Sequence, residues 1–246
     1  CDWSSDVCSS DLMTDDRNVK YVYNTEKATF QVASKEGEDH NIYFKGPYTM
    51  NMTAYAPYTG ERGILAGVIQ ASTTSGKQVG AARASIDFLY AEGGGSQTNP
   101  RVDFQFFHKM SQLVLSFKAG GGLELGDISY TLKNIILDGS FDTSAGSVAL
   151  GKTVGNIEMA LVKSNEMNSS VIVFPQRLTS NLLLELAMGG KTYAEPIGNS
   201  IDLASGSTYV FDVTIAPQAM TISPAKIEDW IWGENSDHYV IAGESE

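Results

Sequence analysis

The feature that most constrains the fold of this chain is a two-residue spacing of hydrophobic side chains that recurs along its length. Three segments show it clearly: YTMNMTAYAP at 48–57, LVLSF at 113–117 and TYVFDVTIA at 208–216. Successive side chains of a β-strand leave opposite faces, so this spacing predicts strands with one buried face. Apolar residues at helical spacing never persist for three turns, so we expect very little helix.

Turn residues separate the predicted strands and set the expected domain organisation. The chain has 246 residues, 24 of them glycine, which is enough for two sandwiches of about 100 residues each. The Gly-rich segment EGGGSQTNPR, 92–101, is the best candidate for a linker because Pro100 cannot continue a central strand. We therefore expect an all-β chain with an N-terminal sandwich at 13–101, truncated at its start, and a C-terminal sandwich at 102–246.

The first twelve residues, CDWSSDVCSSDL, are expected to be foreign to the natural protein. Translated back into codons, residues 2–12 match a common sequencing-adapter primer. A disordered polar tail would account for the same residues. Both cysteines, Cys1 and Cys8, lie in this segment, so we expect no disulfide and no cysteine-bound metal in the remaining sequence. The natural chain is expected to begin upstream of Met13, where an export signal or lipid anchor would lie.

Charge and hydropathy exclude some partners. The formal net charge is -12, which repels phosphate backbones, so nucleic-acid binding is not expected. No window approaches 18 uninterrupted apolar residues, so no transmembrane helix is expected. A signal-peptide pattern is also missing. Either the protein is cytoplasmic or its true N-terminus is not included here.

The sequence contains no pattern typical of a catalytic or metal site. His40, His108 and His238 are far apart, and His108 is interpreted as a structural histidine. Asp138 and Asp142 are four residues apart but lack the further ligands of a calcium loop. No nucleophile elbow or phosphate-binding loop occurs. We therefore predict no catalytic residues, no metal and no cofactor, and do not expect an enzyme.

Two segments, read together, resemble a known family. VDFQFFHKMSQLVLSFKAGGG, 102–122, has the aromatic–His–Lys–x–Ser–x–Leu pattern of the fimbrillin (FimA/Mfa1-like) surface proteins of Bacteroidetes, here from Phe107 to Leu113. TYVFDVTIAPQAMTISPAKIEDWIWG, 208–233, ends in that family's Ile-x-x-Trp segment. With the segments NIYF, MTAYAPY and ASIDFLYA, the resemblance covers about 22–233.

The resemblance implies a fold, a function and a location. Members have two transthyretin-like Greek-key β-sandwich domains and are exported lipoproteins at the outer membrane. They assemble into type V pili, or fimbriae, by adding a strand of one subunit to the next. This implies a structural or accessory pilus subunit at the cell surface whose partners are other pilin subunits, with host or bacterial surface ligands as further partners. The lipid anchor would belong to the missing N-terminus.

The end of the chain, 218–233, is the candidate for the strand that contacts a neighbouring subunit. Pro224 interrupts it, which favours an edge strand or a bend between two short strands. Alternatively, this segment packs on its own domain. The two interpretations are compatible if the segment changes partner on assembly. The candidate contact residues are Met220, Ile222, Ile227, Trp230, Ile231 and Trp232.

Two other functional classes remain open on the sequence. A surface adhesin or glycan-binding lipoprotein that never polymerises would use exposed tyrosines to bind sugar, although aromatic residues in strands more commonly pack in the core. A polysaccharide hydrolase would need two carboxylates that converge in a cleft, which sequence spacing does not reveal.

Overall fold

The protein is almost entirely β-structure. The computed structural model describes residues 2–6, 17–24, 26, 29–33, 42–44, 48–179, 182–197 and 200–230. These residues include one α-helix of five residues, α1 (Gly80–Ala84), and a short 3-10 helix, η2 (Ser75–Lys77). The all-β prediction is confirmed. Within these ranges, none of the helices has the length and apolar character needed to cross a membrane.

The chain divides into two compact units, each built from several segments. The first comprises Cys1–Gln70, Asp87–Lys109 and Ser140–Ser147, and the second comprises Ala71–Ile86, Met110–Gly139 and Val148–Glu246. The domain limits expected from the sequence, 13–101 and 102–246, stay a prediction.

The first unit contains a six-stranded sheet with the order β3-β2-β1-β4-β6-β7. Strand β1 lies inside this sheet and pairs antiparallel with β2 on one side and β4 on the other. Part of the segment expected to be adapter-derived or disordered, residues 2–6, therefore takes a place in the sheet. The strands are β1 (Asp2–Asp6), β2 (Val19–Asn24), β3 (Thr29–Val32), β4 (Met50–Ala56), β6 (Leu89–Gly95) and β7 (Phe107–His108).

The Gly-rich segment 92–101 is not a loop throughout. Glu92 and the following glycines continue β6 and pair with β4 as far as Met50. A Cβ atom on Gly93 would lie 2.7 Å from Val102, and one on Gly95 would lie 2.4 Å from the Phe44 ring. These glycines therefore make room for hydrophobic side chains that pack directly on the strand, a role that composition alone does not reveal.

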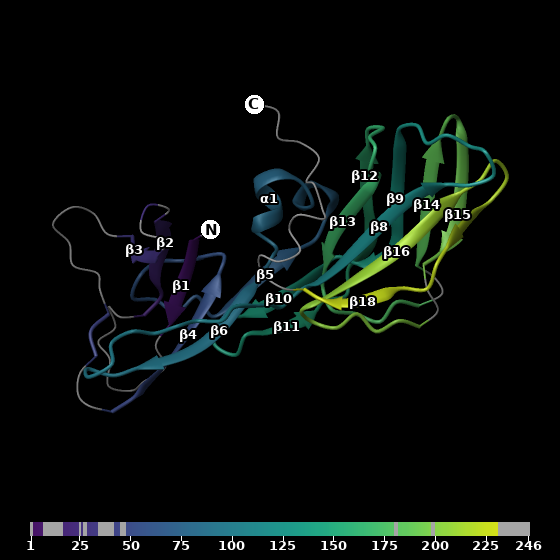
Figure 1. Cartoon of the computed structure of the whole chain (residues 1–246). Helices are drawn as coiled ribbons and strands as arrows, with labels where there is room; N and C mark the ends of the chain where they lie inside the picture. The colour runs from purple at the N-terminus through teal and green to yellow at the C-terminus, as the bar shows by residue number, and fades with distance from the viewer. Residues whose placement is uncertain are drawn as a thin grey trace. The chain divides into compact units, whose positions relative to one another are not determined.

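The second unit contains two sheets, which Figure 1 shows as two layers. One has the order β12-β9-β14-β15, and the other has the order β13-β8-β16-β17, with β18 also paired to β16. The strands of the first are β9 (Ile128–Ile136), β12 (Val154–Leu161), β14 (Leu183–Met188) and β15 (Lys191–Pro196). Those of the second are β8 (Ser111–Ala119), β13 (Asn168–Val173), β16 (Ser207–Ile215), β17 (Met220–Ile222) and β18 (Lys226–Asp229).

A single hydrophobic core lies between these two sheets. It combines residues at alternate positions of β8, β13 and β16 with residues of β9, β12 and β14. Leu115 and Phe211, for example, are both fully buried. The two-residue spacing seen in the sequence therefore identifies the inner face of this sandwich. A further sheet has the order β11-β10-β5, formed by β5 (Val68–Ser72), β10 (Asp138–Asp142) and β11 (Ser147–Leu150).

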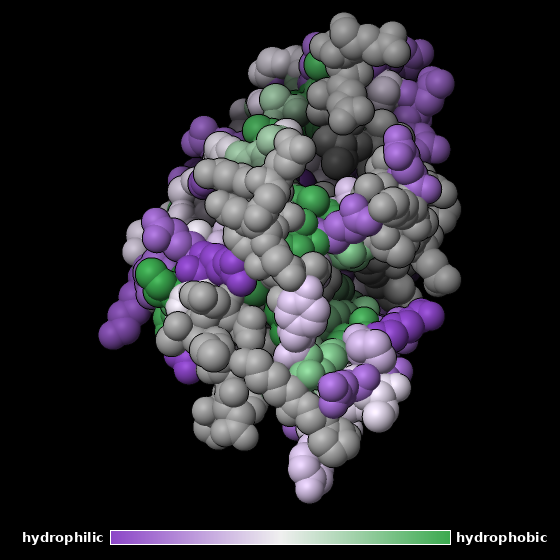
Figure 2. Space-filling view, turned by 90° about the vertical axis from the view of Figure 1, so that its left-hand side faces the viewer, coloured by the Kyte–Doolittle hydropathy of each residue, from purple (hydrophilic) through white to green (hydrophobic). Residues whose placement is uncertain are grey.

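Some large hydrophobic side chains remain at the surface. Figure 2 shows one face of the molecule, on which hydrophobic groups lie among hydrophilic ones. In the first unit, the exposed aromatic residues include Tyr23, Phe30, Tyr43 and Tyr48, of which Tyr48 is 83% exposed.

Candidate subunit-contact strands

Residues 220–229 form the outer strand of one sheet of the second unit. On one side, β16 pairs in parallel with β8 from Thr208 to Ile215. On the other side it pairs antiparallel with two short strands, β17 and β18. Figure 1 shows β16 with β8 and β18 on its two sides. Residues 220–229 therefore act as one interrupted edge strand, which we call the tail.

The interruption of the tail at 223–225 is held to β16 by a local exchange of hydrogen bonds. Ser223 N donates to Asp212 O at 2.9 Å, and Asp212 N donates to the Ser223 hydroxyl at 2.9 Å. Pro224 follows directly and has no N–H to donate. The bend expected from Pro224 is thus present, and Ser223 keeps the backbone of β16 paired where the ladder breaks.

The Asp212 carboxylate ties the tail to β8 as well. It accepts hydrogen bonds from Lys118 Nζ at 2.7 Å and from Lys226 Nζ at 3.3 Å. The hydrogen bond from Lys118, followed by that from Lys226, lowers the pKa of Asp212 below its ordinary value. The spacing of β16 places Asp212 on the outer face, but only the sheet pairing brings the two lysines to it.

The structure separates the candidate contact residues into an anchored group and an exposed group. Met220 is 2% exposed and belongs to the core. Ile222 is partly buried against the same core. All four side chains of β18 are exposed, and Ile227 is 64% exposed. Trp230 is partly buried, and its N–H donates to Gly206 O at 2.8 Å. Ile231 and Trp232 lie outside the described residues.

The backbone of β18 is paired on one side. In and beside β16, the even-numbered residues direct their backbone groups toward the tail, as Gly206, Asp212 and Ala216 show. The backbone N–H of Trp230 donates to Gly206 O. The register pairs Val210 with Lys226 and Thr208 with Glu228. The backbone groups of Ile227 therefore point away from β16. Over the part of the chain that the structure describes, no strand pairs with this outer side.

A second position of interest is the place of β1 in the first unit. Its residues pair with β2 from Asp2 to Ser5 and with β4 from Ser4 to Asp6. A strand in this position forms backbone hydrogen bonds on both flanks, unlike β18. The place of β1 in the sheet is therefore formed by the backbone groups of β2 and β4.

The buried histidine His108 is paired with a carboxylate. His108 Nδ1 lies 2.7 Å from Asp87 Oδ1, and their side chains are 4% and 22% exposed. Next to it, the Lys109 ammonium lies 5.2 Å from the centre of the Tyr90 ring. Among the described residues, no group of three or more His, Cys, Asp or Glu side chains is placed to hold a metal. His40 and His238 lie outside these residues.

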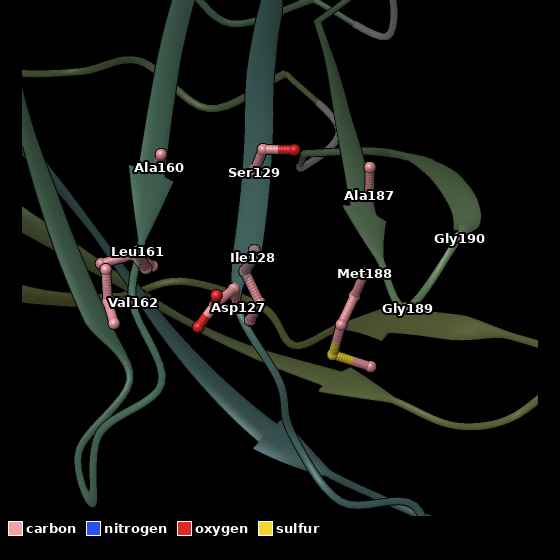
Figure 3. Close-up of a pocket in the computed structure, with 10 residues that line it drawn as sticks. All are labelled: Asp127, Ile128, Ser129, Ala160, Leu161, Val162, Ala187, Met188, Gly189 and Gly190. Carbon is pink, nitrogen blue, oxygen red and sulfur yellow. The ribbon is translucent and has the colours of Figure 1, made fainter.

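A shallow pocket lies at one end of the four-stranded sheet of the second unit. Figure 3 shows that its lining comes from the ends of β9 and β12 and from the turn between β14 and β15. Asp127 is the titratable group that lines it, and its carboxylate accepts a hydrogen bond from Lys163 N at 2.8 Å. The rest of the lining consists of small and apolar residues, so the pocket has no acid–base pair.

Comparisons with known proteins agree with this architecture. A solved candidate cell adhesion protein from Bacteroides ovatus is 31% identical, with a TM-score of 0.84, over 94% of this chain and 87% of that chain. Fim1C, a candidate fimbrium subunit of Bacteroides uniformis, is 24% identical over 232 residues, which are 89% of this chain and 74% of that protein. The tip fimbrial protein Mfa3 of Porphyromonas gingivalis, solved with a C-terminal truncation, shares the fold at 11% identity, with a TM-score of 0.53 over 93% and 94% of the two chains.

The family assignment covers nearly the whole sequence. The model of the fimbrillin-like family matches residues 6–230, which include both the Phe107–Leu113 pattern and the tail. The chain therefore belongs to the fimbrillin-like family.

Proposed function

We propose that this chain is a subunit of a fimbrium at the cell surface and that it joins its neighbours by strand addition. Its family, and the fimbrium and cell adhesion names of its relatives, support the first part. The second part is supported by one observation. The tail ends in a strand, β18, that is paired on one side and keeps all its side chains exposed.

The energetics of the tail favour exchange of β18 rather than of β17. Detaching β17 would expose Met220, which is 2% exposed, and burying such a side chain contributes about 1.5–3 kcal/mol. Detaching β18 costs mainly its backbone hydrogen bonds, each of which contributes about 0.5–1.5 kcal/mol net. Met220 and Ile222 would therefore remain as an anchor while β18 and the residues after it change partner.

The position of β1 is the acceptor that we propose in the neighbouring subunit. A strand there pairs on both flanks, whereas β18 pairs on one flank in its own sheet. For a strand of four residues, the additional bonds would contribute about 2–6 kcal/mol net once β1 has left this position in the neighbouring subunit. Backbone pairing of this kind is independent of most side chains, which is typical of β-augmentation.

A proline at Ile227 tests this proposal, because the Ile227 N–H points away from β16. In the isolated subunit, Ile227→Pro should change the free energy of unfolding by less than about 0.5 kcal/mol. In a site paired on both flanks, the same change removes a hydrogen bond and places a proline in a central strand. We therefore expect the variant to fold but to lose the polymer ladder on non-boiled gels.

Ile227→Val is the matched control, since it keeps the N–H and the branched side chain. It should polymerise like the unmodified protein. Polymers of normal length from Ile227→Pro would contradict the role of β18. If the unmodified protein stays monomeric under all conditions, assembly itself is refuted.

A surface adhesin that does not polymerise is the second candidate function. It is favoured by the exposed aromatic side chains of the first unit, among which Tyr48 is 83% exposed and the Tyr23 and Phe30 rings pack edge to face at 5.2 Å. Exposed aromatic rings can stack on sugars. Binding to a glycan array that is lost in Tyr48→Ala, from a protein that remains monomeric, would support this candidate over the first.

A further inference from the structure

One side of the second unit is closed by a segment that belongs to neither of its sheets. Residues 73–85, which we call the strap, contain η2 and α1. The strap begins at Thr73, whose N–H and hydroxyl both donate to Leu137 O, at 2.7 and 3.2 Å. From there it runs along β12 and β13, the outermost strands of the two sheets on this side.

Gln78 of the strap occupies the place of a neighbouring strand beside β13. Its side-chain amide accepts a hydrogen bond from Ile172 N at 2.8 Å and donates one to Ile172 O at 2.9 Å. It also donates to Thr73 O at 2.8 Å. A paired strand would satisfy the same two backbone groups of Ile172. Gln78 is 2% exposed, so this arrangement is buried.

Two more strap residues complete the closure. Arg83 Nη1 donates to Ser170 O at 2.6 Å, and its Nη2 donates to the Ser170 hydroxyl at 2.8 Å. On the other sheet, Glu158 N of β12 donates to the Ser75 hydroxyl at 2.8 Å. The outer edges of both sheets are therefore hydrogen-bonded to side chains of the strap.

The composition of β13 makes this closure necessary. Exposed edge strands are usually protected by charged residues or proline. β18 has three charged residues of four, KIED, and β15 has Lys191, Glu195 and Pro196. β13 reads NSSVIV and has neither charge nor proline. Uncharged segments with β-branched residues pair readily with copies of themselves.

The backbone of β13 is also suited to pairing with a second copy. Met167 O accepts a hydrogen bond from Phe117 N at 2.8 Å, so the backbone N–H and C=O groups of the odd-numbered residues point toward β8. The backbone groups of the even-numbered residues point outward, where the side chains of Gln78 and Arg83 form hydrogen bonds with them. Two β13 strands related by a twofold axis would pair antiparallel and satisfy each other's outward groups.

We infer that the outer edge of β13 is a latent dimerisation site for β13 of a second copy, and that Gln78 and Arg83 keep it closed. The strap replaces the partner strand with side-chain hydrogen bonds within the same chain. Closing this edge also limits strand addition to the other side of the sheet, a consequence that rests on the proposed function.

The test combines Gln78→Ala and Arg83→Ala in the full chain. Every protein in the experiment carries Ile227→Pro, which removes assembly through β18. Dimerisation through β13 is therefore tested independently of the proposed strand addition. At a protein concentration low enough to keep the double variant monomeric, we expect amide hydrogen exchange at Ile172 to rise by about tenfold, since about one net hydrogen bond is lost. Light scattering should show a dimer that increases with protein concentration. Lys77→Ala, an exposed strap residue, is the control and should stay at the mass of its parent.

A third substitution shows whether the dimer uses β13. Ser170→Pro removes an outward N–H and leaves the ladder to β8, so its addition to the double variant should restore the monomer. If the double variant does not fold, Gln78→Glu keeps the size of the side chain, removes its donors and should dimerise. The inference is overturned if exchange at Ile172 is unchanged, if it rises without dimer formation, or if the dimer survives Ser170→Pro.

Discussion

The tail offers a graded test of how it is held, by truncation of Met220, Ile222 and Ile227 to alanine one at a time. Met220 is 2% exposed and part of the core, so its truncation should cost about 2–5 kcal/mol. The edge position of β17 lets the site collapse in part, which favours the lower half of that range. Ile222 is only partly buried and should cost about 1–2 kcal/mol. Ile227, 64% exposed, should change stability by less than about 0.5 kcal/mol.

Hydrogen exchange of core amides in β16 measures this series, because it reports the opening free energy of the second unit by itself. The expected order of the losses is Met220, then Ile222, then Ile227. Amides of β17 should also exchange faster in Met220→Ala than in Ile227→Ala. An equal or larger loss for Ile227→Ala would refute the conclusion that the tail is anchored at its start and exposed at its end.

Two further predictions concern ionisable groups of the second unit. Burial raises the pKa of Tyr130 to about 12 from its ordinary value of 10.0, and its hydroxyl is hydrogen-bonded to Ser169 at 2.7 Å. The folded state therefore holds the Tyr130 proton more tightly than the unfolded state does. The contribution of Tyr130 to the free energy of unfolding should be fully present below pH 10, and it should fall by about 2–3 kcal/mol as the pH rises toward 12. Phenolate absorbance and urea unfolding across this range measure the effect, and an equal alkaline loss in Tyr130→Phe would contradict it. Because Lys118 and Lys226 lower the pKa of Asp212, its contribution should be present above the unfolded value and disappear as the pH falls through the folded value. Lys118→Met should raise the Asp212 pKa in an NMR titration of the carboxyl group, and an unshifted titration would refute the pairing.

The burial of many side chains of this chain could be anticipated, because it depends on the spacing of hydrophobic residues within each strand. The two-residue spacing placed Leu113, Leu115 and Phe117 on an inner face, and they are 0%, 0% and 4% exposed. It also placed Tyr209, Phe211, Val213 and Ile215 inward, and these are at most 2% exposed. Pro224 correctly indicated a break in the tail, because proline has no N–H to donate to the ladder.

The same reasoning fails where the environment of a residue comes from distant segments. The glycines after Glu92 suggested a loop, but they form a strand because Val102 and Phe44 need the space that a side chain would fill. In the tail, the side chains of Met220 and Ile227 looked equivalent, yet one is buried and the other is exposed. Their difference arises because β18 extends along β16 without a facing layer that covers its side chains.

The sequence by itself determined the type of element and the inner faces of the strands, since alternation is a property of neighbouring residues. Only the tertiary structure decided which strands are neighbours. The parallel pairing of β8 with β16 joins segments about 96 residues apart, as Thr208 and Gln112 show, and the closure of β13 by Gln78 joins residues 94 apart. Contacts over such distances depend on the course of the whole chain, and no local pattern in either segment encodes its partner.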